Sequence, residues 1–217
     1  MSSFINLSLT IFARCDLKAV DLGEGGVPHI DFERLEIEDL ILITPRKHAD
    51  SRGFSSETFS ADEFGARGLE AYGFVQDDHV YSAQRGVLRG LHFQLQPRAQ
   101  GKLVRCTRGA IFVVAVNIRA GSPSYGRHVG VELSATNWKQ RWIPPGFAHG
   151  YVTLEEQCEV IYKVTNYYSP ECDRGIVWDD PALAINWRLS YTEIILLDKD
   201  RKWPRLSEIA PACYFED

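Results

Sequence analysis

The chain has 217 residues, of which 45% are hydrophobic and 12% aromatic, enough for one domain with a sizeable core. Its net charge of -5 and isoelectric point near 5.7 argue against a protein that binds the phosphate backbone of nucleic acids. No apolar run approaches the roughly 20 residues of a membrane-spanning helix. The N-terminus has neither the basic start nor the small-residue cleavage site of a targeting peptide.

The chain divides by pattern into two parts. Residues 1–38 are weakly patterned and are expected to form an N-terminal extension of unknown role. Residues 39–217 are expected to form a single domain, which begins with a strand at 40–44 that Pro45 ends.

One short helix is expected at 60–69, because Ser60 is a good N-cap and Glu63 follows three residues later. After it the chain reads as all-β. The expected strands are 73–80, 86–94, 102–107, 110–119, 127–134, 139–144, 149–154, 159–168 and 174–178.

Short strands separated by glycine and proline turns are typical of a β-sandwich or barrel. The stretch 111–118 is apolar on both faces, so it is expected to be covered on both sides, by stacked sheets or at a subunit interface.

The chain contains an odd number of cysteines and no Cys-x-x-Cys pair, which disfavours a disulfide framework or a zinc site and fits a reducing, cytoplasmic setting. Two of them lie inside strand-like runs and are expected to fill the core as small apolar side chains. The five are Cys15, Cys106, Cys158, Cys172 and Cys213.

The strand around His92 has one polar and one apolar face, because side chains alternate along a strand. Gly90, His92 and Gln94 share the polar face. Leu91 and Phe93 occupy the other face and belong in an apolar layer. The polar face therefore lines a space that tolerates histidine and glutamine.

The next strand places Lys102, Val104 and Cys106 on one face, and a lysine on an inward face is costly to bury without an anionic partner. On the later strand, Tyr162 and Tyr168 share a face and reach one cavity. A histidine base, a phenol acid and a cation together suggest proton abstraction next to a carbonyl.

Each of these residues also fits an ordinary structural role: a hydrogen-bonded histidine, tyrosines at the rim of a core, a solvated lysine. Together with Arg89 they indicate a functional cavity. The turn at 142–150 adds His149, which either binds a ligand at the cavity mouth or caps backbone groups. A metal site is weakly supported, because Gln94 stands where a His-x-His pair would need its second histidine.

These stretches together resemble the dTDP-4-dehydrorhamnose 3,5-epimerase family, cupin-fold enzymes of nucleotide-sugar biosynthesis that supply cell-surface polysaccharides. The match runs from about residue 40 to about residue 206, and its blocks agree in order and spacing. They are 51–54 with Glu57, 74–77, 86–94, 100–105, 145–150, 162–170 and 197–200.

The resemblance implies a jelly-roll homodimer that needs neither metal nor cofactor. His92 matches the base and Asp200 the aspartate that pairs with it. Tyr162 matches the acid on the other side of the sugar, and Lys102 would stabilise the enolate oxygen.

The resemblance also assigns substrate contacts. The family's N-terminal strands exchange between subunits, so Arg52 and Glu57 would serve the partner's site. Tyr167 matches a contact to the nucleotide base. The matching substrate-binding residues are Arg52, Glu57, Gln76, Arg89, His149 and Tyr168.

Two departures stand out. The family's usual Gln-Asp-Asn is here Gln76-Asp77-Asp78, so an amide becomes a carboxylate that only accepts hydrogen bonds when ionised. The segment 80–85 is one residue longer than usual.

Three interpretations follow. The first is inversion of C3 and C5 of a dTDP-4-keto-6-deoxy sugar, and its close variant inverts only one of these carbons. The second is a cupin that binds sugar without turnover, which the presence of His92, Asp200, Tyr162 and Lys102 disfavours. The third, a metal-dependent oxygenase, is disfavoured by Gln94.

Overall fold

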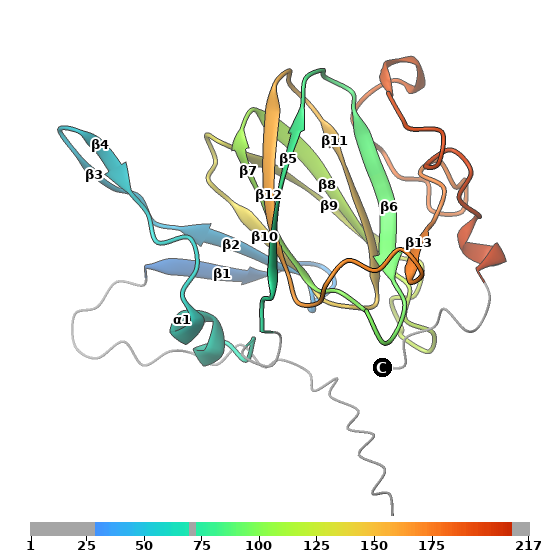
Figure 1. The fold of residues 1–217 in the computed structure, drawn as a ribbon, viewed down its shortest axis with the longest axis horizontal. Coiled ribbons are helices and arrows are strands. Elements are labelled where there is room, and N and C mark those ends of the chain that lie inside the picture. The colour runs from blue at the N-terminus through green and yellow to red at the C-terminus, as the bar shows by residue number, and fades with distance from the viewer. Residues whose placement is uncertain (1–28, 70–72, 210–217) are drawn as a thin grey trace, which may run out of the picture.

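The computed structural model of the chain describes residues 29–69 and 73–209. Within these residues the fold is almost entirely β, and two antiparallel sheets face one another as a jelly-roll barrel (Figure 1). The all-β prediction is confirmed. No helix in the described ranges is long and apolar enough to cross a membrane.

The strands form two large sheets and one projecting hairpin. The larger sheet has the order β1 (Ile30–Arg34), β2 (Ile41–Pro45), β10 (Gln140–Ile143), β7 (Lys102–Arg108), β12 (Cys158–Val164) and β5 (Gln76–Ser82). The smaller sheet has the order β13 (Asp173–Gly175), β6 (Leu88–Gln94), β11 (Phe147–Thr153), β8 (Ala110–Asn117) and β9 (His128–Ser134). The hairpin of β3 (His48–Asp50) and β4 (Gly53–Ser55) extends away from the barrel (Figure 1).

Every predicted strand has an observed counterpart, whereas β1, β3 and β4 were not predicted. β1 belongs to the stretch 1–38, and it pairs along its whole length with β2. Residues 1–28 of that stretch lie outside the described residues, so the division at residue 39 stays a prediction.

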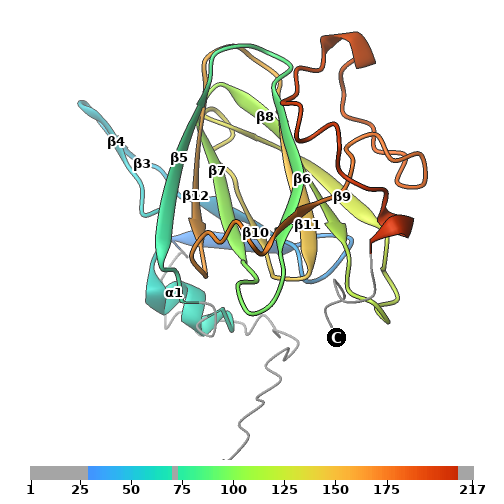
Figure 2. The same cartoon turned by 45° about the vertical axis from the view of Figure 1, so that its right-hand side comes forward.

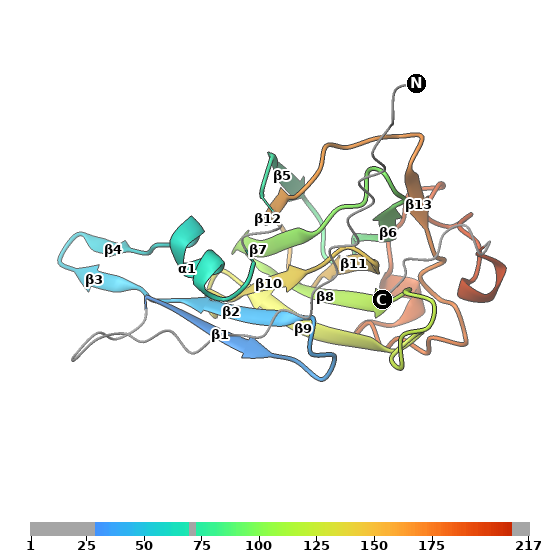
Figure 3. The same ribbon diagram turned by 90° about the horizontal axis from the view of Figure 1, so that it is seen from below.

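The single α-helix, α1 (Ala61–Ala66), begins as predicted in the described part of the chain, since the Ser60 side chain accepts a hydrogen bond from the Glu63 N–H. It ends earlier than residue 69. Its buried Phe64 belongs to an apolar cluster on the outer face of the larger sheet, next to β1 and β2 (Figure 3). Two short 3-10 turns follow near the C-terminus, Tyr191–Glu193 and Leu206–Glu208.

Strand β8 is buried on both faces, as its composition predicted. Ile111, Val113 and Ala115 face the other sheet inside the barrel. Phe112 and Val114 face outward into a second cluster, formed with the C-terminal segment 176–206 that covers the smaller sheet (Figure 2). A cover from the same chain therefore replaces the subunit interface that was the alternative for this outer face.

Strands β6 and β11 approach unusually closely where two glycines meet. His92 pairs with His149 and Arg89 with Tyr151, so three steps on β6 oppose two on β11. This is a β-bulge. Because cross-strand partners lie on the same face, Arg89 and His92 both face the interior, whereas strict alternation would separate them. Gly90, which alternation grouped with His92, is the extra residue of the bulge.

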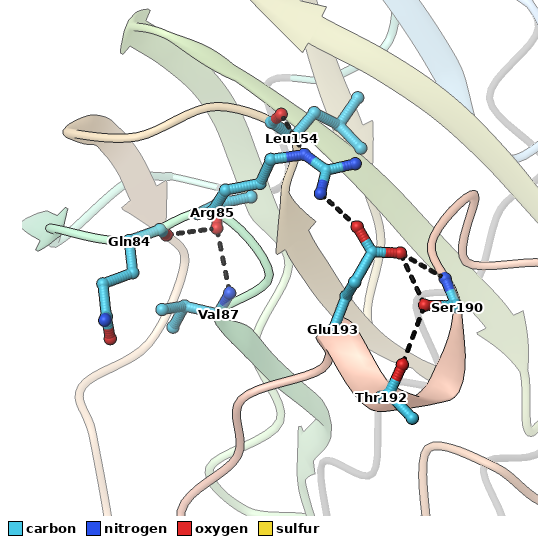
Figure 4. Close-up of polar contacts among 8 residues, drawn as sticks. Gln84, Arg85, Val87, Leu154, Ser190, Thr192 and Glu193 are labelled. Carbon is cyan, nitrogen blue, oxygen red and sulfur yellow. Dashed lines mark hydrogen bonds and ion pairs between the residues drawn. The ribbon is translucent and has the colours of Figure 1, made fainter.

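A clasp holds the loop before β6 to the C-terminal segment (Figure 4). Arg85 pairs with Glu193, whose carboxylate also accepts hydrogen bonds from the Ser190 hydroxyl and N–H. The Ser190 hydroxyl and then Arg85 lower the pKa of Glu193 to about 2. Val87 and Ile195 form a parallel bridge beside the clasp. These contacts therefore fix the start of β6 and the segment after residue 190 to each other.

The bulge predicts which glycine substitution the fold cannot accept. An added Cβ at Gly90, which has φ +143°, would lie 2.5 Å from Gly150 Cα. At Gly53 the φ is +137° and nothing lies within 4 Å of the added atom. Both positions are strained for alanine, but only Gly90→Ala also adds a backbone clash.

We expect Gly90→Ala to lower the free energy of unfolding by about 1–3 kcal/mol more than Gly53→Ala does. Urea unfolding of the two variants measures this difference. An equal loss of unfolding free energy in the two variants would show that the β6–β11 contact at Gly90 leaves room for a side chain.

Candidate active site

One wall of the barrel interior carries two histidines and an arginine. Arg89 and His92 come from β6, and the paired residues Tyr151 and His149 come from β11. The bulge at Gly90 brings Arg89 to this wall. His149, predicted where the turn at 142–150 meets the strand at 149–154, lies inside β11, which already begins at Phe147, and it is buried.

The facing wall carries a cation, a phenol and a carboxylate. Asp78, Tyr162 and Val104 are direct partners across β5, β12 and β7, so they form one row. Lys102 lies on the same face as Val104, and its Nζ is 5.3 Å from the centre of the Tyr162 ring. The shared face of Lys102, Val104 and Cys106 is confirmed, because Val104 and Cys106 are both in the interior core.

His92 and Asp200 form a close pair. His92 Nε2 lies 2.7 Å from Asp200 Oδ1, and Asp200 is 2% exposed. Burial raises the pKa of Asp200, but the hydrogen bond with His92 and then the bond from Trp203 outweigh it, so the pKa is lowered overall. An ionised Asp200 therefore fixes one ring nitrogen of His92 and leaves the other for chemistry.

Two features of the fold bring Asp200 to His92. Gly175 pairs with His92 across β13 and β6, and a Cβ on it would lie 2.6 Å from the Trp203 indole. The missing side chain lets Trp203 pack there and donate a 3.3 Å hydrogen bond to Asp200. The bridge of Ile195 to the start of β6 fixes the same segment.

Burial determines the charge state of Lys102. Burial lowers the pKa of its ammonium to about 8, and Asp78 and then Asp173 oppose this effect. No described side chain accepts a hydrogen bond from the ammonium. An electrophile of this kind is available to a developing enolate oxygen.

His149 is neutral near pH 7. Burial lowers its pKa well below the usual value, and the charges of Lys102, His92 and Arg141 lower it further. Its Nδ1 has no hydrogen-bond partner among the described residues. His149 is therefore a neutral histidine with one buried ring nitrogen that is unpartnered in the described part of the chain.

Tyr162 keeps its proton. Burial raises the pKa of its hydroxyl to about 12, Asp78 adds to the increase, and Arg89 opposes it. A phenol that is protonated throughout the neutral range can act as a proton donor.

The prediction that Tyr168 shares a face with Tyr162 is wrong, because β12 ends at Val164. Thr165 and Gly101 exchange hydrogen bonds of 2.8 and 3.1 Å, which turn the chain into a loop. Tyr167 and Tyr168 lie on this loop and are more than half exposed. The loop still borders the site, because the Tyr168 N–H donates to Gln76, which lies on the same face of β5 as Asp78.

Arg52 and Glu57 do not belong to either of these two walls. Arg52 lies at the tip of the projecting hairpin, its side chain is 88% exposed, and it pairs with Asp50 at 2.6 Å. Glu57 follows the hairpin and is exposed.

Several residues in or beside the barrel interior were not predicted from the sequence. Arg141 of β10 is fully buried inside the barrel and donates to the carbonyls of Val113 and Val129. Burial lowers its pKa to about 9. Alternation with the outward Trp142 could have found it. The others are Tyr151, Asp173 and Trp203.

No group of three His, Cys, Asp or Glu side chains that could hold a metal is present in residues 29–69 and 73–209. Gln94 uses its amide to bind backbone groups, including the Ser169 N–H at 2.7 Å. The expected metal independence stays a prediction.

The barrel and this site define a class. A carboxylate-held histidine faces a lysine and a protonated tyrosine across a jelly-roll interior, which is the arrangement of a cupin-type sugar epimerase. The comparisons identify the family. The family model for dTDP-4-dehydrorhamnose 3,5-epimerase matches residues 34–208, and the chain belongs to this family, whose activity is that of an isomerase.

The chain is similar to known proteins along most of their length. The chain is 52% identical over 188 residues to a dTDP-4-dehydrorhamnose 3,5-epimerase of Sinorhizobium fredii, covering 87% of this chain and 95% of the relative. It is 42% identical to a 3,5-epimerase structure from Legionella pneumophila in complex with dTDP-4-keto-L-rhamnose, with a TM-score of 0.82 and coverage of 87% and 99%. A 3′-monoepimerase structure from Streptomyces bikiniensis, in complex with dTDP-quinovose, is 30% identical, with a TM-score of 0.73 and coverage of 80% and 87%.

The partly buried ammonium of Lys102 predicts opposite effects on activity and stability. Its pKa of about 8 lies below the ordinary 10.5, so below pH 8 the folded state bears the cost of burying a charge. This cost fades as pH rises from about 8 to 10.5, where both states become neutral.

We expect Lys102→Met to abolish activity yet raise the free energy of unfolding at pH 7 by up to about 3 kcal/mol. Urea unfolding at pH 7 and pH 10.5 measures the gain and its loss. Lys163→Met is the control, because Lys163 pairs with the exposed Asp77 on the outer face. A Lys102→Met protein that is less stable at pH 7 would contradict this account.

Proposed function

We propose that the chain inverts C3 and C5 of a dTDP-4-keto-6-deoxy sugar by removing and returning protons. The observation that carries the proposal is that His92, hydrogen-bonded to Asp200, lies on one sheet, opposite Lys102 and Tyr162 on the other. Inversion needs a base and an acid on opposite faces of the sugar ring, and the two facing sheets supply them.

The chemistry follows from the ketone at C4, which acidifies the hydrogens on C3 and C5. His92 takes the proton from carbon and becomes an imidazolium, which Asp200 stabilises. The electron pair moves onto the C4 oxygen as an enolate, which Lys102 stabilises by its charge. Tyr162 then gives its proton to the opposite face of the carbon, and exchange with solvent restores both groups.

Arg89 is proposed to bind the diphosphate of the substrate. Arg89 projects from the same wall as His92, and a guanidinium binds phosphate oxygens through two hydrogen bonds at once. Gln76 and His149 face the barrel interior and are proposed to contact the sugar. Tyr167 and Tyr168, exposed on the loop beside the site, are proposed to contact the base and the diphosphate.

A homodimer is proposed to complete the site. Arg52 and Glu57 lie on or beside a hairpin that extends from the barrel, and Phe54 on the same hairpin is 50% exposed. A second subunit would cover this hairpin and receive Arg52 and Glu57 at its own cavity.

The buried thiols of Cys106 and Cys158 fill the interior core as predicted and support a reducing, cytoplasmic setting.

Solvent deuterium exchange tests the reaction. The protein is incubated in heavy water with dTDP-4-keto-6-deoxyglucose and a chelator, and NMR monitors C3 and C5 of the sugar. We expect both carbons to exchange their hydrogens for deuterium and to be inverted. His92→Asn should lower the rate of exchange by several orders of magnitude, because this substitution removes the base. Tyr162→Phe should keep partial exchange while inversion falls.

Each alternative outcome has a consequence. Exchange at one carbon alone would identify a single-centre epimerase, like the 3′-monoepimerase that shares the fold. No exchange in the intact chain would contradict the proposed reaction. Full inversion by Tyr162→Phe would move the acid to another residue.

Mixed dimers test the exchange of hairpins. Arg52→Ala and His92→Asn are each expected to be inactive alone. If Arg52 serves the partner's cavity, a mixed dimer has one site with both changes and one intact site. Reassociation of equal amounts should restore about a quarter of wild-type activity, because half of the dimers are mixed and each has one working site. No recovery, or a monomer by light scattering, would contradict the exchange.

A further inference from the structure

The row of side chains across β5, β12 and β7 contains an acid that the proposed mechanism does not use. Asp78 is the direct partner of Tyr162, which is in turn the partner of Val104. Lys102 starts one row further along, yet its Nζ reaches to 5.3 Å from the Tyr162 ring centre. The ammonium therefore extends toward the row that Asp78 begins.

Hydrogen bonds from Gln76 fix the orientation of the Asp78 carboxylate. Its amide oxygen accepts the Tyr168 N–H at 3.3 Å, which fixes the orientation of the amide. Its amide nitrogen then donates to both Asp78 oxygens, at 3.1 and 3.0 Å. The carboxylate is held beside Tyr162 and cannot turn away without losing these bonds.

We propose that Asp78 is a positioning residue, the fixed counter-ion that keeps Lys102 and Tyr162 protonated for the reaction. The inference rests on the roles proposed for these two residues. One negative charge acts on both in the same sense, since it stabilises the ammonium and opposes a phenolate.

Other charged and titratable groups face this pair from every neighbouring strand. Three are cationic or basic on the opposite wall, and the remaining acids are engaged elsewhere: Asp200 with His92, and Asp173 with Lys199 at 3.4 Å. The charge of Asp78 raises the pKa of Lys102 more than that of Asp173 does, and Asp78 also raises the pKa of Tyr162. Among the described residues, and besides Asp78, the charged and titratable groups that face the pair include Arg89, His92, Cys106, Arg141, His149, Tyr151, Asp173 and Asp200.

The test compares neighbouring carboxylates. Asp78→Asn removes the inward charge with little change in size. Asp77→Asn makes the same change on the outward face, where Asp77 is 60% exposed and pairs with Lys163. Asp78→Glu keeps the inward charge. Thermal unfolding first establishes that all three variants fold.

The direct readout is NMR titration of the Lys102 side chain in the free protein, assigned by its loss in Lys102→Met. Asp78→Asn should lower the titration midpoint by about one pH unit, as expected for loss of a nearby opposite charge. Asp77→Asn and Asp78→Glu should leave the midpoint in place. An unchanged midpoint in Asp78→Asn would overturn the inference.

The kinetic readout is kcat/KM against pH. The alkaline limb of Asp78→Asn should move to lower pH, so activity at pH 9 falls about tenfold relative to wild type while activity at pH 6 changes little. An equal loss at every pH would indicate a contact to substrate and would overturn the positioning role. Inactivity of the wild-type chain would contradict the proposed function alone, because the NMR titration needs no turnover.

Discussion

The close contact of two glycine backbones, Gly90 on β6 and Gly150 on β11, is the constraint on which the site depends. The bulge that it permits turns Arg89 to the same wall as His92. Any side chain at either glycine would collide with the opposite strand. The proposed base and the proposed phosphate contact therefore owe their common direction to two residues that carry no chemistry themselves.

The interior of this barrel combines apolar side chains with cations. Val104 and Val113 lie beside Arg141, which is fully buried, and the partly buried Lys102 shares a face with Val104. Such an arrangement costs stability, because a buried charge without a close partner is poorly solvated. It is well suited to a reaction that develops negative charge on a substrate oxygen, because preorganised cations need not rearrange as the charge appears.

Much of this could be predicted from sequence, since period-two alternation and turn residues locate the strands and the Ser60 cap locates the helix start. The shared face of Lys102 and Val104 also followed from alternation. The bulge at Gly90 could not be predicted, because only the opposing strand shows that an extra residue is present. Likewise β12 ends at Val164 through bonds between Thr165 and Gly101, partners 64 residues apart. β1, β3 and β4 were missed because short, weakly patterned strands depend on their neighbours for stability.

In the proposed mechanism the base and the acid contact opposite faces of one sugar ring inside the barrel. A crystal structure of Tyr162→Phe with dTDP-4-keto-6-deoxyglucose would show whether they do. We expect the free ring nitrogen of His92 against C3 or C5 on one face, the phenyl ring that replaces the Tyr162 phenol on the other, and the C4 oxygen directed at Lys102. A sugar bound outside the barrel, or with both side chains on the same face, would contradict it.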